Sequence, residues 1–445
     1  MTRLSVRWPK ARSARRLLTL TAATLLIAWG EPGHSLQSAA KPATAATSGH
    51  VKRPPARSFA IHLPAKAIAY QRDGYWMLFV GMPWSFGGLL LFLVSGASAR
   101  LRTAIYAALH TSAPQEGQPP RLLPLALFYA GFTLALTAWS LPLTLASIHI
   151  ERAYGFSRES NLGILRDSAL DFVLQLVWAP VLWLAYRVYN RLGARWWLTL
   201  WAILTPLVVL STLIQPVLIA PLFNHYTPLP SGDLRTQIER LERRAGITGA
   251  ELLVENTSKR TTHVNAYVTG LGPSARIVIN DTAVHELPEG EVLAMVGHEM
   301  GHYVEGHVWV ETASQVAGLG VFLWLADMLL PALERRLRGW AHTRSILDMA
   351  ALPVISLTIS LFLWVQQPVA NLESRYLEHR ADAFGLRLTH RNNDMARLFV
   401  GFAERDYDDP NPPALIRFWF YSHPPLDERI RFALEYNDAA GSSAN

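Results

Sequence analysis

The stretch from Trp197 to Phe223 reads WLTLWAILTPLVVLSTLIQPVLIAPLF and contains no charged residue. It exceeds the roughly 20 apolar residues that a helix needs to cross a bilayer. A helix that is apolar on every side must be surrounded by lipid or by the core of a large protein. The stretch therefore predicts a membrane-spanning helix, with a buried helix of a soluble core as the alternative.

Five further long apolar runs lie on both sides of this stretch: Trp76–Ala97, Leu123–Ser147, Leu170–Tyr189, Thr312–Leu333 and Leu347–Val369. Charged residues make up 17% of the 445-residue chain, whereas about a quarter is usual for soluble domains. Trp or Tyr flanks three of the six runs, as is common at membrane interfaces. This pattern makes the soluble alternative improbable and predicts a mainly α, multipass helical membrane protein with about six or seven transmembrane helices.

The amino-terminal segment, residues 1–30, has basic residues ahead of an apolar run from Leu17 to Trp29. Such a segment is a secretory signal peptide or a first transmembrane helix, and the sequence leaves both open. Residues 31–74 are rich in Ala, Pro, Ser and Lys, which predicts a linker.

The net charge of +7 comes mostly from Arg, and the Arg residues sit beside the apolar runs. That placement favours membrane topology signals over a nucleic-acid surface, so we expect no nucleic-acid partner. Alternate short loops differ in Arg content, and with the basic amino end in the cytoplasm the richer loops also lie there. The loop charges thus favour the non-cytoplasmic face for the polar part of the chain. The absence of Cys excludes disulfides and thiolate metal ligands.

The strongest local motif is EGEVLAMVGHEMGHYVEGH, from Glu289 to His307. Its H-E-x-x-H core places His298 and His302 one helical turn apart, where both imidazoles can bind one metal ion. Glu299 points to the same side and can act as a general base on a metal-bound water. The motif therefore indicates a metallopeptidase, and a chance match on an amphipathic helix is the alternative.

A third metal ligand is needed. His307 lies nine positions after His298, about half a turn around a continuous helix, so we expect it to be an exposed helix-end residue. Glu378 and Asp382, four positions apart, share a helix face in NLESRYLEHRAD. One could bind metal while the other hydrogen-bonds a ligand imidazole, although a solvated charged face would also fit the pattern.

The chain resembles the type I CAAX prenyl endopeptidase family, membrane-embedded zinc proteases of the gluzincin type. The resemblance extends from about residue 75 to 435 and rests on seven segments in order: IERAYGFSRES (150–160), IAPLFNHYTPLPSGDL (219–234), SKRTTHVNAYVTGLG (258–272), RIVINDT (276–282), HEMGH (298–302), NLESRYLEHRADAFG (371–385) and YSHPPLDERI (421–430).

The resemblance implies that Glu378 is the third ligand of a single Zn²⁺ ion and that Asp382 hydrogen-bonds His298. It also implies that His423 stabilises the oxyanion of the tetrahedral intermediate. A His followed by two prolines sits on stiff extended backbone, which suits a fixed donor, although a turn-lining histidine is the alternative. Asn371 and Arg375 occupy positions that order the active-site helix in the family.

Asn265, Ala266 and Tyr267 lie on an expected strand that pairs with residues 275–280 through a turn at residues 272–274. That strand could bind substrate backbone by edge addition, whereas a plain hairpin wall would need no partner.

The expected fold is a helical bundle enclosing a chamber, joined to a split gluzincin-like domain with a small β-hairpin or sheet. Residues 75–223 and 311–370 would hold the transmembrane helices, and residues 224–310 and 371–445 the two catalytic parts. The resemblance implies a zinc endopeptidase in the bilayer that removes the C-terminal residues of prenylated proteins, acting on a peptide or protein substrate that can carry a lipid.

Three other functions stay open. One is a membrane-protein quality-control zinc protease without a prenyl requirement. A transporter is a remote alternative, motivated by Asp171 and Asp327 within apolar runs. A catalytically dead scaffold is the third.

Overall fold

The computed structural model describes residues 59–270, 275–341 and 343–437. Residues 1–30, expected to form a signal peptide or a first helix, and most of the expected linker lie outside these ranges. The helices of the amino-terminal half are α2 (Ala65–Val94), α3 (Ala97–Ala108), α4 (Leu122–Tyr154), α5 (Asn161–Leu176), α6 (Trp178–Leu192), α7 (Trp196–Ile214) and α8 (Ala220–Phe223).

The carboxyl-terminal half carries the strands and the remaining helices. The strands are β1 (Tyr226–Pro228), β2 (Glu251–Glu255), β3 (Ala266–Thr269) and β4 (Arg276–Asn280). The helices are α9 (Asp233–Arg244), α10 (Asp281–Glu286), α11 (Glu289–Val304), α12 (His307–Ala341), α13 (Leu352–Thr389), α14 (Asn392–Glu404), α15 (Ala414–Phe420) and α16 (Leu426–Glu435).

Within the described residues, five helical segments are long and apolar enough to cross a membrane: Ala65–Val94, Leu122–Tyr154, Asn161–Phe223, His307–Leu333 and Met349–Thr389. The 63 residues of Asn161–Phe223 are too long for one crossing at 1.5 Å per residue. This segment folds back at Gly193, whose φ of +49° ends α6 before α7 begins. Each of the six apolar runs of the sequence overlaps one of these five segments over nearly its whole length, and the prediction of a multipass helical protein is confirmed.

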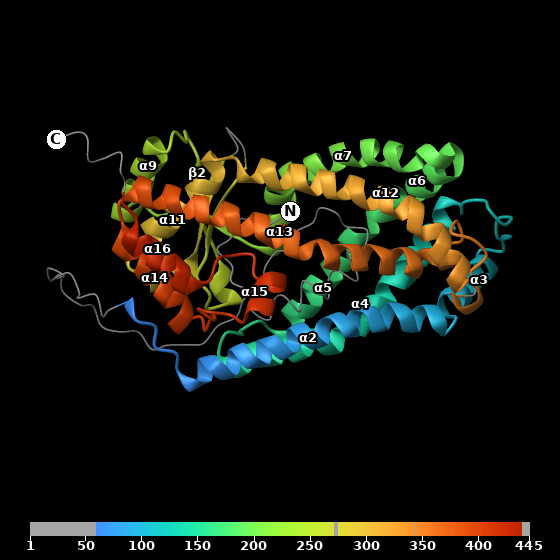
Figure 1. The fold of residues 1–445 in the computed structure, drawn as a ribbon, viewed down its shortest axis with the longest axis horizontal. Helices are drawn as coiled ribbons and strands as arrows, with labels where there is room; N and C mark the ends of the chain where they lie inside the picture. Colours follow the sequence, from blue (N-terminus) through green and yellow to red (C-terminus); the bar gives the residue numbers. More distant parts are fainter. Residues whose placement is uncertain (1–58, 271–274, 342, 438–445) are drawn as a thin grey trace.

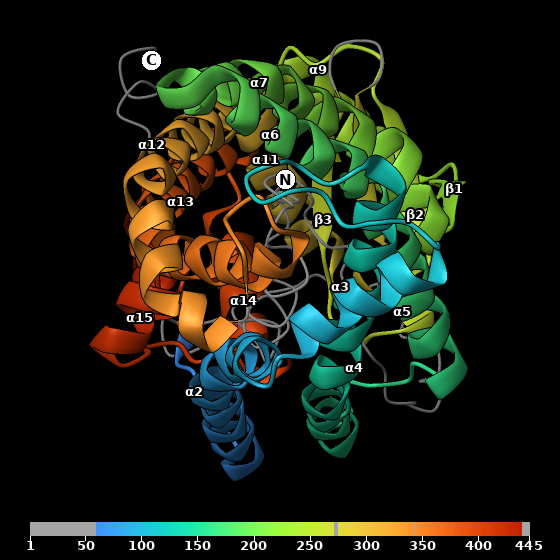
Figure 2. The ribbon, with the colours of Figure 1, turned by 90° about the vertical axis from the view of Figure 1, so that its right-hand side faces the viewer.

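The long helices stand side by side in a ring, which is the arrangement that an enclosed chamber requires (Figure 2). Large apolar side chains are exposed on these helices: Trp76 is 64% exposed, Val177 63% and Val369 68%. An apolar exterior of this kind is stable against lipid chains but not against water. The exterior is thus consistent with a bundle embedded in the bilayer.

The polar elements gather at one end of the long axis, where α9, α11, α14 and α16 lie together, while α3 lies at the opposite end (Figure 1). The small sheet has the strand order β1-β2-β4-β3; β2 and β4 are parallel and the outer pairs are antiparallel. The expected pairing of the strand after Asn265 with residues 275–280 is present, as Ala266 pairs with Ile279. The turn at residues 272–274 lies outside the described residues.

Two boundaries expected from the sequence fall inside continuous helices. The boundary at residue 310/311 lies in α12 and that at 370/371 lies in α13, so each helix runs from the membrane bundle into the polar end without a break. The reason is that a helix satisfies its own backbone hydrogen bonds in lipid and in water alike, so a change of side-chain polarity does not end it.

The boundary predicted for the carboxyl end of the linker, at residue 74, was wrong, because α2 already begins at Ala65. The first turns of α2 are polar and pack on the polar end of the molecule rather than on lipid. The Lys66 amine donates a hydrogen bond to the Tyr154 carbonyl, and the Gln71 amide donates to the Tyr407 carbonyl.

Candidate active site

The site begins with an unusually close contact between helices α11 and α13. A methyl group added to Gly385 of α13 would lie 2.8 Å from the backbone nitrogen of His298, and one added to Gly301 of α11 would lie 3.1 Å from the Ala381 Cα atom. Because real contacts of this kind are rarely below about 3.5 Å, only glycine permits this approach. The two glycines therefore bring the H-E-x-x-H helix against the helix that carries Glu378.

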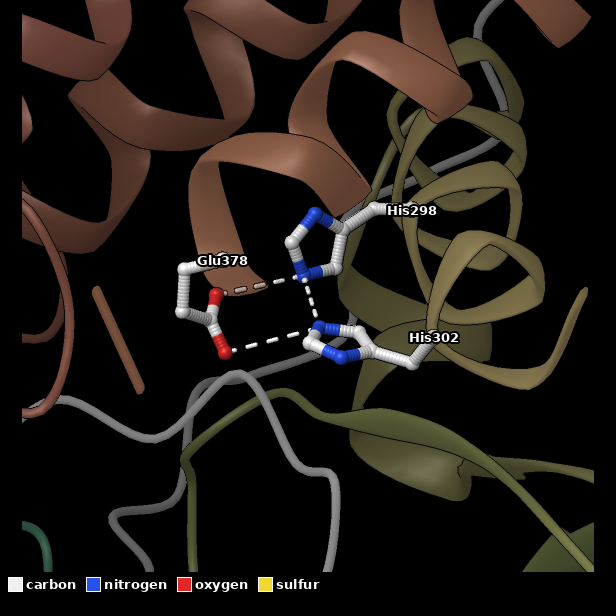
Figure 3. A group of neighbouring side chains, drawn as sticks. All are labelled: His298, His302 and Glu378. Carbon is white, nitrogen blue, oxygen red and sulfur yellow. Dashed lines mark hydrogen bonds and ion pairs between the residues drawn. The ribbon is translucent and has the colours of Figure 1, made fainter. Parts of the chain in front are cut away.

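Three side chains from these helices meet at one point (Figure 3). The Nε2 atoms of His298 and His302 are 3.1 Å apart. Glu378 Oε2 lies 3.3 Å from His298 Nε2, and its Oε1 lies 3.4 Å from His302 Nε2. All three residues are buried, and among the described residues no other group of three or more His, Asp or Glu side chains brings its ligand atoms within 4.8 Å of one another. The structure thus brings together the three residues that the sequence analysis named as ligands.

Glu299 and His423 border the same point. Glu299 is 1% exposed and its Oε1 lies 4.0 Å from His298 Nε2. His423 reaches the site from the segment between α15 and α16, with Nε2 at 3.1 Å from Glu378 Oε1. Both therefore lie where a substrate carbonyl next to the three ligand atoms would meet them.

Asp382 Oδ1 lies 2.8 Å from His298 Nδ1, which is the contact expected from the sequence. The same carboxylate also accepts two hydrogen bonds from Arg429, at 2.7 Å from Nε and 2.5 Å from Nη2. Arg429 is 2% exposed, and its guanidinium lies 4.3 Å from the Phe399 ring centre and 3.6 Å from Glu378. Arg429 thus holds both carboxylates of the site in place.

Sequence reasoning missed Arg429, although a signal was present. On α16 the apolar residues Leu426, Ile430 and Ala433 form the buried face, and Arg429 falls on that same face. A charge on an apolar helix face needs a buried partner of opposite charge.

The surroundings of the two imidazoles shift their pKa values in opposite directions. Burial lowers the pKa of His302 to about 4, which keeps this ring neutral. Burial also acts to lower the pKa of His298, but hydrogen bonds to Asp382 and Glu378 outweigh it and raise that pKa to about 10. A metal ion at this point would therefore compete with one proton, carried by His298.

Asn371 and Arg375 hold the backbone that carries His423. The Asn371 amide donates a hydrogen bond to the Trp419 carbonyl at 2.7 Å. The Arg375 guanidinium donates to the Tyr421 carbonyl at 2.5 Å. Their direct role in the structure is to fix the segment after α15 against α13, which sets where His423 stands.

Strand β3 lies next to α11 and forms an outer edge of the sheet. Asn265, just before the strand, is 4% exposed, and its side-chain amide has no hydrogen-bond partner within the described part of the chain. Ala266 is buried in the core, while the Tyr267 hydroxyl donates a hydrogen bond to Glu255. An unpaired buried amide at a sheet edge is suited to bind a further peptide strand.

The prediction for His307 was wrong. This residue is 1% exposed, and its Nδ1 lies 2.9 Å from His302 Nδ1. The helical spacing does not apply, because α11 ends at Val304 and Gly306, with φ of +67°, turns the chain before α12 begins at His307. The turn directs the His307 ring back onto the ligand.

Comparisons with known proteins show the family of the chain. Residues 228–437 match the model of Peptidase family M48, and residues 54–225 match the model described as CAAX prenyl protease N-terminal, five membrane helices. The chain is 30% identical to the uncharacterized metalloprotease YhfN of Bacillus subtilis, over 84% of this chain and 86% of that protein. The chain belongs to peptidase family M48. This M48 peptidase is also 30% identical to the CAAX prenyl protease 1 homolog of Arabidopsis thaliana, over 72% and 76% of the two chains.

The fold of this M48 peptidase is shared with a solved structure. The crystal structure of S. mikatae Ste24p superposes with a TM-score of 0.72 at 21% identity, covering 96% of this chain and 98% of that one. Membership of family M48, together with the membrane-spanning helices, makes the protein a multipass membrane metallopeptidase that acts on a peptide or protein substrate. Asp327, which had suggested a transporter, accepts a hydrogen bond from the Trp196 indole at 2.5 Å and thereby joins α12 to α7.

Proposed function

We propose that this M48 peptidase is a zinc endopeptidase whose ion is held by His298, His302 and Glu378. The observation that carries the proposal is the spacing of the three ligand atoms, 3.1, 3.3 and 3.4 Å. Zinc bonds of about 2.0–2.1 Å in tetrahedral geometry place neighbouring ligand atoms about 3.3–3.4 Å apart. Two imidazoles and one carboxylate are also a donor set found in catalytic zinc sites.

When bound, zinc supplies a water of lowered pKa and polarises the scissile carbonyl. The other steps fall to the chain's own residues. Glu299 accepts the proton of the attacking water and returns it to the leaving amine. His423 donates a hydrogen bond to the oxygen anion that develops on the carbonyl. The edge of β3 from Asn265 through Tyr267 binds the substrate backbone and aligns the scissile bond.

For the substrate, we propose the carboxyl-terminal peptide of a polypeptide that carries an isoprenoid lipid. The support is the similarity to proteins named CAAX prenyl protease 1 in Arabidopsis thaliana and other organisms. The site lies at the end of a membrane bundle, where a lipid chain would remain in the bilayer while the peptide enters.

A second substrate class is favoured by the charges of the loops. The loops at the end opposite the site carry nine Arg: Arg100, Arg102, Arg121, Arg191, Arg195, Arg335, Arg336, Arg338 and Arg344. The short loop at the site's end carries three: Arg152, Arg158 and Arg166. By the positive-inside rule, the catalytic end faces away from the cytoplasm. If prenylated proteins are absent from the non-cytoplasmic side of the membrane, unmodified membrane proteins are the expected substrates.

The deciding experiment uses the purified full chain and two peptides, one farnesylated near its carboxyl end and its unmodified twin. We expect cleavage that a chelator abolishes and added Zn²⁺ restores. Preference for the farnesylated peptide supports the first substrate class, and equal cleavage supports the second. Cleavage that persists after chelation refutes the metal mechanism.

The Glu299→Gln variant separates metal binding from chemistry. It keeps the shape of the site, so zinc should stay bound, while loss of the proton acceptor should lower cleavage by about 100-fold to 10,000-fold. Substantial turnover by a zinc-loaded E299Q protein contradicts the role of Glu299.

Sidedness can be tested because the chain has no Cys. Arg191→Cys and Arg240→Cys place single thiols at exposed positions on opposite ends of the molecule. In intact cells a membrane-impermeant maleimide should label R240C and spare R191C; the reverse pattern would place the site in the cytoplasm.

A further inference from the structure

The two imidazoles of the proposed metal site have different partners on their outer nitrogens. His298 Nδ1 faces the Asp382 carboxylate at 2.8 Å, an arrangement common for metal-bound histidines. His302 Nδ1 instead faces another imidazole, His307 Nδ1, at 2.9 Å. Both rings of this second pair are buried, so water does not substitute for the contact.

The contacts allow one direction for the hydrogen bonds. His302 directs Nε2 toward His298 and Glu378, so its ring proton resides on Nδ1 whenever Nε2 binds a metal. That N–H donates, and His307 Nδ1 must therefore accept. The proton of His307 then lies on Nε2, which is 3.2 Å from Glu305 Oε2.

Glu305 is itself fixed. Its Oε2 lies 2.8 Å from the Nε atom of Arg380, a residue of α13 two positions after Glu378. The chain of contacts thus runs from His302 of α11 through His307 of α12 and back to α13. It links the three helices that surround the proposed metal site, and Gly306 provides the turn that makes it possible.

We propose that His307 is a positioning residue that fixes the tautomer and ring orientation of His302, and that Glu305 and Arg380 fix His307 in turn. This inference rests on the proposed metal site. An imidazole suits this position better than a carboxylate because of its charge. Glu378 and Asp382 already place two carboxylates at the site, and the neutral His307 ring orients His302 without adding a third negative charge.

Two substitutions at His307 separate hydrogen bonding from packing. His307→Asn keeps an acceptor where Nδ1 stands, whereas His307→Leu keeps bulk and removes the acceptor. We expect zinc affinity, measured by chelator competition, to fall about 10-fold to 100-fold in H307L and to stay at the wild-type value in H307N. His285→Leu, at an exposed position on α10, is the matched control and should leave affinity unchanged.

The Co²⁺ absorption spectrum of each metal-loaded variant gives a second measurement. The spectrum should change in H307L and not in H307N, because it reports how the ligands are arranged. Equal losses in both variants would mean that an acceptor at the Nδ1 position does not orient His302, and would refute the inference. Wild-type affinity in H307L would mean that His307 only fills space, and would refute it as well.

If H307L does not fold, Glu305→Ala gives the same test, because Glu305 holds His307 from the partly exposed end of this chain of contacts. Loss of that acceptor frees His307 to put a proton on Nδ1, facing the His302 proton, so affinity should fall about tenfold. Unchanged affinity in E305A would overturn the inference while leaving the proposed function standing. A wild-type protein that binds no metal would overturn both.

Discussion

The close contact between α11 and α13 makes a single methyl group a sharp test of the site. In Gly385→Ala, the new methyl would lie 2.8 Å from the His298 nitrogen and 3.0 Å from its Cα atom. Unstrained carbon contacts are about 3.5–4.0 Å, so the helices must separate by roughly 0.5–1 Å. The contacted atoms are backbone atoms of α11, which cannot rotate away as a side chain could.

The expected magnitudes follow from this displacement. Overpacking costs about 1–3 kcal/mol, and replacing a helical Gly by Ala returns up to about 1 kcal/mol, so the net loss of stability should be about 0–3 kcal/mol. The rate of cleavage should fall more than the stability does, because misplacing reactive groups by about 1 Å can lower a rate about 100-fold. Gly385→Ala should therefore fold and lose most of its activity and metal affinity.

The measurements are peptide cleavage, zinc affinity by chelator competition, and thermal unfolding in detergent. Gly74→Ala is the matched control, since Gly74 also lies within a helix but has no heavy atom within 4 Å of the added methyl. It should gain up to about 1 kcal/mol and cleave normally. A Gly385→Ala protein with full activity and a raised melting temperature would refute the idea that this contact sets the site.

Two further predictions concern the charges of the site. Arg429→Met leaves the buried Asp382 carboxylate without its guanidinium and should destabilise the protein by about 3–5 kcal/mol in chemical unfolding. Adding Asp382→Asn to that variant should restore part of the loss, and a further loss of similar size would contradict the pairing. Zinc binding should release about one proton between pH 5 and 9, because His298 holds a proton up to a pKa of about 10 while His302, at about 4, does not. The zinc affinity should then rise about tenfold per pH unit over this range. Calorimetry in buffers of different ionisation enthalpy measures the number of protons released on zinc binding. A value near zero would contradict the raised pKa of His298.

Much of the fold could be predicted because lipid imposes one strong rule. A bilayer-spanning segment must be long, apolar and helical, so length and polarity alone reveal it. What polarity could not reveal was where a helix stops. Helix α2 starts at Ala65 rather than at residue 75, and α12 and α13 continue past the expected boundaries, since polar turns at the ends of a long helix resemble a linker in composition.

The candidate site, like the fold, could be predicted from the sequence only in part. The spacing of His298 and His302 needs only one helix, so it was readable from the motif. Glu378 lies two apolar runs away, and the residues alone left a solvated charged face as the simpler interpretation; the family resemblance chose between them. The position expected for His307 was wrong because it required one continuous helix from His298 to His307, whereas α11 ends at Val304 and Gly306 turns the chain.

By itself, the sequence determined the class of the protein and two of the three residues of the proposed metal site, because the polarity of a segment and the spacing along a single helix are local properties. Tertiary structure alone decided that Gly301 and Gly385 let two helices approach closely, that Arg429 binds Asp382, and that His307 turns back onto His302. Those contacts join residues that only packing brings together, and no spacing along the chain encodes the distance between two helix backbones.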